Sequence, residues 1–97
     1  MSLNVTKRLS HKLWDYSEEG WVLRDGSSDQ KVNDNKVVTF NCGIYMLVDG
    51  QEQYVGRAEG FTDNDVLKTN IQGVPTSMLA DVSHVIDGLV AALQADN

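Results

Sequence analysis

The segment 43–56 constrains the fold most, because it reads Gly-Ile-Tyr-Met-Leu-Val-Asp-Gly-Gln-Glu-Gln-Tyr-Val-Gly and is nearly symmetric about Asp49-Gly50. An Asp-Gly pair between strand-forming residues favours a two-residue turn with positive φ at both positions, which Gly accepts without a Cβ penalty. The segment therefore predicts a β-hairpin. The pairs expected to face each other are Val48 with Gln51, Tyr45 with Tyr54, Ile44 with Val55, and Gly43 with Gly56.

The two strands of this hairpin are expected over 36–48 and 51–59. In the first strand, alternation places Phe40, Cys42 and Ile44 on one face, and Tyr45 and Leu47 on the other. Both faces carry apolar side chains, so we expect a cover on each: the C-terminal helix on the first, and an N-terminal helix or another subunit on the second.

The N-terminal segment 4–18 predicts a short amphipathic helix. Val5, Leu9 and Leu13 recur at four-residue steps, and Gly20 follows as a stop signal. Residues 21–24 are expected to form a short strand that ends in a turn-forming cluster. Residues 63–71 fit either a helical turn that begins at Thr62 or a strand, and the sequence does not decide between them.

The segment 75–94 gives the clearest helical pattern in the chain, with Pro75 at its start and a wide apolar stripe at helical spacing. We therefore predict a single α+β domain over residues 1–97: an antiparallel sheet of three to four strands built on the hairpin, a short N-terminal helix, and this long helix packed on the sheet.

The charge of the chain excludes several classes of partner. The net charge is −6, and residues 41–97 hold two basic side chains against eight acidic ones. Such a surface repels phosphate backbones and anionic lipid, so neither a nucleic acid nor a membrane is expected as a partner. A basic protein partner is compatible with it.

The single Cys42 cannot form an internal disulfide, so the sequence favours the cytoplasm, and its alternation with core residues predicts a buried, unreactive thiol. His11 and His84 lack partners at metal-ligand spacing, and we find no phosphate-binding loop or nucleophile elbow. The sequence therefore predicts no catalytic residue, cofactor or metal.

The two halves of the hairpin, Gly43-Ile44-Tyr45 and Tyr54-Val55-Gly56, resemble the paired motif of the GIY-YIG nucleases. The resemblance covers about fourteen of 97 residues. It implies adjacent strands, tyrosines that serve phosphodiester cleavage, a downstream helical Arg and a metal-binding Glu. Only Tyr45 and Tyr54 match, because Arg57 is expected on the strand and no Glu follows on the last helix.

The function predicted is therefore a small, acidic, non-catalytic protein–protein interaction or regulatory module that forms a homodimer. Its candidate interaction surface consists of Tyr45, Leu47, Tyr54, Gly43, Gly56 and Ala58. One alternative is a small-ligand-binding domain with a pocket between sheet and helix. A degenerate GIY-YIG-like nuclease hairpin is the second alternative, which the missing Arg and Glu disfavour.

Overall fold

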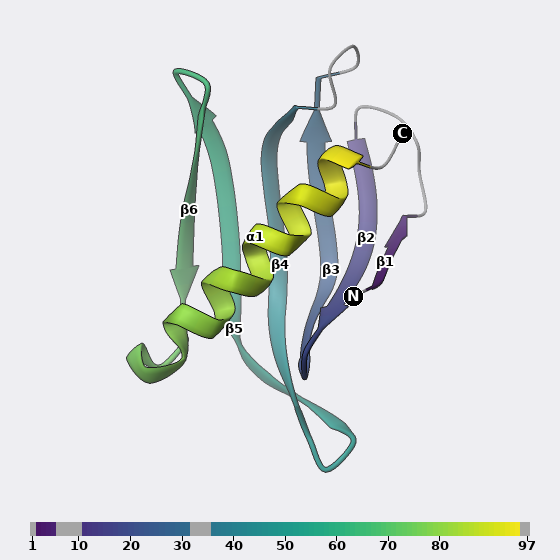
Figure 1. Cartoon of the computed structure of the whole chain (residues 1–97), viewed down its shortest axis with the longest axis vertical. Helices are drawn as coiled ribbons and strands as arrows, with labels where there is room; N and C mark the ends of the chain where they lie inside the picture. Colours follow the sequence, from purple (N-terminus) through teal and green to yellow (C-terminus); the bar gives the residue numbers. More distant parts are fainter. Residues whose placement is uncertain (1, 6–10, 32–35, 96–97) are drawn as a thin grey trace.

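The computed structural model describes residues 2–5, 11–31 and 36–95. They form one six-stranded antiparallel sheet and one C-terminal helix (Figure 1). The strands lie side by side in the same order as in the sequence. The strands are β1 (Ser2–Val5), β2 (His11–Glu18), β3 (Trp21–Gln30), β4 (Val37–Val48), β5 (Gln51–Asp63) and β6 (Val66–Gln72). A short 3-10 turn (Thr76–Met78) leads into α1 (Leu79–Ala95).

Three of the hairpins close through two-residue turns in which both central residues have positive φ, as in type I′ turns. The turns are Glu19-Gly20 between β2 and β3, Asp49-Gly50 between β4 and β5, and Asn64-Asp65 between β5 and β6. Their backbone twist matches the twist of the strands, which keeps consecutive strands adjacent and produces the simple up-and-down order.

The predicted fold class is wrong in two respects: the sheet has six strands rather than three to four, and the described part of segment 4–18 is strand. In β2 the side chains alternate with a period of two, and Lys12, Trp14 and Tyr16 are buried. Lys12 is buried although it is charged, so the alternation of burial does not appear as an alternation of polarity in the sequence. Gly20 belongs to a hairpin turn rather than to a helix end.

Segment 63–71, which the sequence left open between helix and strand, lies mainly in β6. Thr62-Asp63-Asn64-Asp65 resembles a helix cap, but Asn64 and Asp65 adopt the left-handed conformation that a tight turn needs. Asn and Asp tolerate this conformation better than other non-glycine residues.

The central hairpin forms as predicted near its turn, with Val48 opposite Gln51 and Tyr45 opposite Tyr54. Beyond the tyrosines the register shifts by one residue, because Val55 is an extra residue in β5. Ile44 therefore lies opposite Gly56, and Gly43 opposite Arg57. Such a β-bulge exchanges the faces of every later side chain in the bulged strand relative to the regular pattern.

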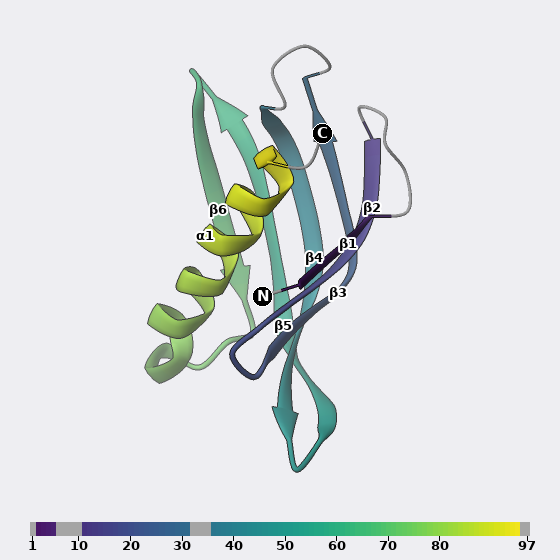
Figure 2. The same cartoon turned by 45° about the vertical axis from the view of Figure 1, so that its right-hand side comes forward.

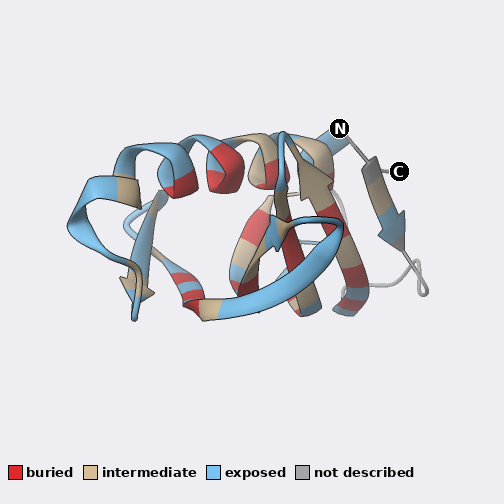
Figure 3. Cartoon of the chain, turned by 90° about the horizontal axis from the view of Figure 1, so that it is seen from below, coloured by how far each residue is buried: buried red, intermediate tan, exposed pale blue. Residues whose placement is uncertain are grey.

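The C-terminal helix begins at Leu79, after the 3-10 turn, and crosses one face of the sheet diagonally from the lower end of β6 toward β2 and β3 (Figure 1; Figure 2). We call this the helix face. Most buried segments lie between α1 and the sheet (Figure 3). The core cluster consists of Trp14, Tyr16, Leu23, Val37, Phe40, Cys42, Ile44, Ala58, Val82, Val85, Ile86, Leu89 and Leu93.

The segment Thr76–Ala95 is, within the described residues, the one helix long and apolar enough to cross a membrane. Five of its residues are buried in this structure, and they line the side of α1 that packs on the sheet. The sheet therefore accounts for the apolar stripe that the sequence shows.

Glycines on the helix face leave room for large side chains of the core. A Cβ at Gly26 would overlap the Trp14 ring, and a Cβ at Gly60 would overlap the Phe40 ring. At Gly88, a Cβ would lie 2.8 Å from the Tyr16 hydroxyl. Gly88 thus lets α1 approach β2.

We predict that Gly60→Ala destabilises the protein by about 1–3 kcal/mol, because the added methyl displaces the buried Phe40 ring. Urea unfolding followed by circular dichroism measures the loss. The neighbouring Glu59 is exposed, so Glu59→Ala should change the free energy of unfolding by less than about 0.5 kcal/mol. Equal stability of the two variants would show that Phe40 does not depend on this space.

Candidate interaction surface

The face of the sheet opposite α1, which we call the outer face, is not covered by any helix or strand among the described residues (Figure 3). Large apolar side chains on this face are exposed, including Tyr54 at 64%, Phe61 at 53% and Leu47 at 43%. Tyr54 and Leu47 lie close together near the β4–β5 turn, whereas Phe61 lies farther along β5. Adjoining exposed side chains of this size are typical of a site that binds another molecule.

The two tyrosines of the hairpin meet on the outer face. Their ring centroids are 5.5 Å apart and the rings are inclined by 74°, in an edge-to-face arrangement. Such pairs contribute about 0.5–1.5 kcal/mol beyond the burial of their area. Leu47 projects from β4 on the same face, two residues beyond Tyr45. We call Tyr45, Leu47 and Tyr54 the tyrosine surface.

The structure separates the six residues that the sequence assigned to the interaction surface. Gly43 lies on the outer face with the tyrosine surface, between Arg24 and Arg57 on the adjacent strands. Gly56 and Ala58 are buried on the helix face, opposite Ile44 and Cys42. Their expected place on the face of the tyrosines is wrong, because the bulge at Val55 exchanges the faces of β5.

A charged cluster borders the tyrosine surface. The Arg24 side chain donates two hydrogen bonds to the Glu52 carboxylate, at 2.9 Å from Nε and 2.6 Å from Nη2, and its Nη1 lies 3.3 Å from Asp15 Oδ2. The hydrogen bonds from Arg24 lower the pKa of Glu52. The bond to Glu52 likewise raises the pKa of Arg24. With two carboxylates and one guanidinium, the cluster has one excess negative formal charge.

A hollow of about 270 Å³ lies at this cluster. Its lining combines apolar side chains from Val22 and Leu47 with the charged groups of Asp15, Arg24 and Glu52, and the remaining lining residues are Asn4, Tyr16 and Ser17. A second hollow, of about 380 Å³, adjoins it through Asn4 and Asp15. The first hollow is large enough for one long side chain, and it offers an apolar wall with carboxylates at its rim.

This cluster was not predicted from the sequence, although the sequence contains a signal for it. Asp15, Arg24 and Glu52 lie on three strands, two of which were expected to be a helix and a four-residue strand. Once β2 and β3 are recognised as paired strands, alternation places Asp15 and Arg24 on the same face as Tyr45.

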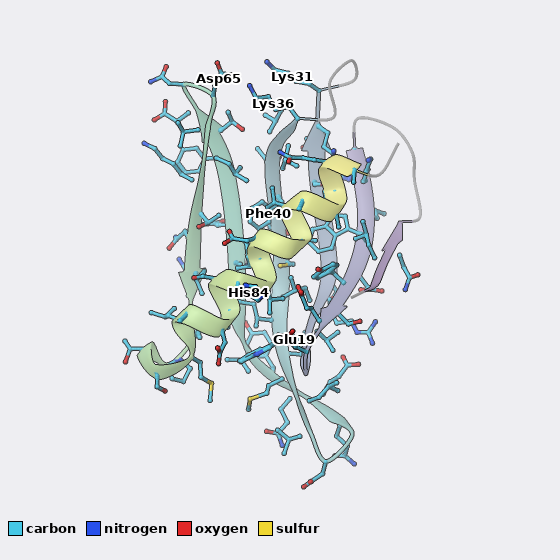
Figure 4. The ribbon with its side chains drawn as sticks, viewed as in Figure 1. Glu19, Lys31, Lys36, Phe40, Asp65 and His84 are labelled. Atoms are coloured by element: carbon cyan, nitrogen blue, oxygen red, sulfur yellow. The ribbon has the colours of Figure 1, made fainter. Side chains whose placement is uncertain are left out.

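Other reactive groups are dispersed. Lys31 and Lys36 lie near Asp65 at one end of the sheet, His84 lies on α1, and Lys36 Nζ is 2.9 Å from Asp65 Oδ1 (Figure 4). Within residues 2–5, 11–31 and 36–95, no group of three or more His, Cys, Asp or Glu side chains could hold a metal ion.

No protein-family model matches the chain, and no curated protein or solved structure shows significant similarity to it. The resemblance to GIY-YIG nucleases stays limited to the hairpin. Arg57 projects from β5 rather than from a helix. Because of the register shift at Val55, Gly43 and Gly56 do not face each other. Phosphodiester cleavage needs a cationic group or metal at the developing charge, and the described residues of α1 include no Arg or Lys.

Cys42 is buried as predicted, at 2% exposure. Burial in the core raises the pKa of its thiol to about 12, so the thiolate that reacts with electrophiles is not formed at neutral pH. We predict that the native protein does not react with a thiol-specific chromogenic disulfide at pH 8, whereas the urea-unfolded chain reacts with one equivalent.

The same pKa shift makes a prediction for stability. The unfolded thiol ionises near its ordinary value of 9.0, while the native thiol stays protonated until about 12. The unfolded state alone loses a proton in this window, so the contribution of Cys42 to stability decreases as pH rises from 9 to 12. Cys42→Ala should show a weaker dependence on pH over this range in urea unfolding, and an unchanged dependence would contradict the assignment.

Proposed function

We propose that the chain is a non-catalytic protein–protein interaction module, homodimeric, that binds a basic protein segment on the outer face of its sheet. The observation that carries this proposal is the exposed tyrosine surface beside the Asp15–Arg24–Glu52 cluster. Protein interfaces are enriched in aromatic residues at their centre and are polar at their rim.

The chemistry of the surface favours a basic partner. Two carboxylates surround one guanidinium in the cluster, and Asp49 adds a further negative charge at the hairpin turn. A partner Lys or Arg could extend its apolar stem along Val22 and Leu47 and place its charge near Asp15 and Glu52. The exposed ring of Tyr54 offers a further contact for a cation.

The other two functions considered from the sequence find less support. A small-ligand pocket was expected between sheet and helix, whereas the two hollows described above are lined by residues of β1–β5 and include no residue of α1. In the core cluster, five buried side chains of α1 pack against eight buried side chains of the sheet. The nuclease function would need a cationic side chain on the helix that follows the hairpin, and the described residues of α1 include no Arg or Lys.

Tyr54→Ala tests the interaction surface. Because the ring is 64% exposed, its removal should cost mainly the contact with Tyr45, about 0.5–1.5 kcal/mol of stability. Truncation of an interface aromatic typically weakens binding by about 2 kcal/mol or more, about thirtyfold in Kd. Proteins retained by the immobilised wild-type domain are identified, and one retained protein is purified and titrated against both forms by calorimetry.

Phe61→Ala is the matched control, because Phe61 lies on the same strand and face and is 53% exposed, but lies seven residues from Tyr54. It should bind the purified partner as the wild type does. Binding to a basic partner should also weaken with increasing salt. Equal affinity of wild type and Tyr54→Ala, or binding that salt does not change, would refute the proposal.

A further inference from the structure

The strand β6 forms an open edge of the sheet. It is the last strand in the order, and no strand among the described residues pairs with its far side (Figure 1). The opposite edge, β1, has four residues, whereas β6 has seven. An edge strand exposes a row of unpaired N–H and C=O groups, and proteins usually protect a long edge from pairing with another chain.

Several usual protective features, a bulge and a Pro among them, are missing from β6. Its seven residues pair with β5 without a bulge, and Val66–Gln72 contains no Pro. The one Lys of the strand, Lys68, projects on the outer face and binds Asp63 at 2.9 Å. Residues 66–80 contain no Asp or Glu, although the second half of the chain is strongly acidic. The edge thus lacks the charge that would repel a second copy.

The backbone groups that face outward follow from the turn. A two-residue loop closes on a hydrogen-bonded pair, here Asp63 and Val66, and bonded and non-bonded pairs alternate along an antiparallel ladder. Leu67, Thr69 and Ile71 therefore direct their N–H and C=O groups away from β5. These three residues also share the helix face, where Thr69 is exposed and the other two are partly buried.

We propose that a second copy of the chain pairs with β6 in an antiparallel arrangement about a two-fold axis at Thr69. In this register Thr69 faces Thr69 of the partner subunit, and Leu67 faces the partner subunit's Ile71. Three facing pairs then exchange about six hydrogen bonds. On the outer face, Lys68 lies opposite Asn70 of the partner subunit, so no like charges face each other directly.

The position of the helix supports this arrangement. The turn that leads into α1 lies outside β6 on the helix side of the sheet (Figure 1; Figure 3). It carries Val74, Met78 and Leu79, which are partly exposed. A strand added to β6 would lie beneath this turn, so its apolar helix-face residues, Leu67 among them, would be covered. The two-fold axis places the second α1 at the opposite end of the paired strands, where the two helices do not collide.

The inference specifies the homodimer of the proposed function and leaves the partner-binding outer face unused. Because residue 69 faces its own copy, opposite charges at this position provide a stringent test. Thr69→Lys and Thr69→Glu should each raise the dimer Kd by about tenfold or more, and an equal mixture of the two should recover the wild-type affinity as a heterodimer. Sedimentation equilibrium measures the dimer Kd of each variant and of their mixture. Gln53→Lys, an exposed change at the β4–β5 turn, should not affect the dimer.

A second measurement uses the wild type alone. The amide hydrogens of Leu67, Thr69 and Ile71 should exchange slowly at concentrations where the dimer forms and quickly after dilution. The proposal is overturned by a wild type that stays monomeric, by variants that dimerise as the wild type does, or by a mixture that does not recover. Tyr54→Ala should leave the dimer intact, so loss of partner binding and loss of dimerisation remain separate results.

Discussion

The structure depends on the burial of one amphipathic helix against one face of a six-stranded sheet. Val82, Ile86, Leu89 and Leu93 of α1 supply the helix side of the core. Burial of each such side chain contributes about 1.5–3 kcal/mol, and no second described helix adds to it. The sheet can receive the helix closely because Gly26 and Gly60 make space for Trp14 and Phe40 under it. A sheet covered on one side only exposes its other face, and because the sheet is open its last strand has one unpaired side.

The bulge at Val55 decides which residues belong to each side of this two-layer structure. Without it, regular alternation would direct Gly56 and Ala58 outward, away from α1. With it, Ala58 lies opposite Cys42 and is fully buried, while Tyr54 remains beside Tyr45 on the outer face. One extra residue therefore allows a single strand to supply small residues beneath the helix and an aromatic residue to the candidate interaction surface.

Local turn chemistry explains what the sequence could predict. Asp49-Gly50 has one favoured geometry, so the hairpin and the Tyr45–Tyr54 contact follow from a few residues. The bulge cannot be found in this way, because the pattern of β5 is regular and the shift is selected by packing against α1. The N-terminal strands were missed for a related reason: Lys12 is buried and Leu13 exposed, which reverses the pattern that polarity predicts. The charged cluster on the outer face depends on these strands and was missed with them.

The open edge and the open face together give the proposed dimer a further property. In an antiparallel pair of strands, facing residues project to the same side of the sheet. A two-fold axis at Thr69 therefore places both helices on one side of a continuous sheet and both tyrosine surfaces on the other. A partner with two basic segments could bind both surfaces at once, and the second contact would then be intramolecular and strengthened by its effective concentration. A monomeric variant such as Thr69→Lys keeps each tyrosine surface but loses this gain, so it should bind a single basic segment as the wild type does and a two-segment partner more weakly.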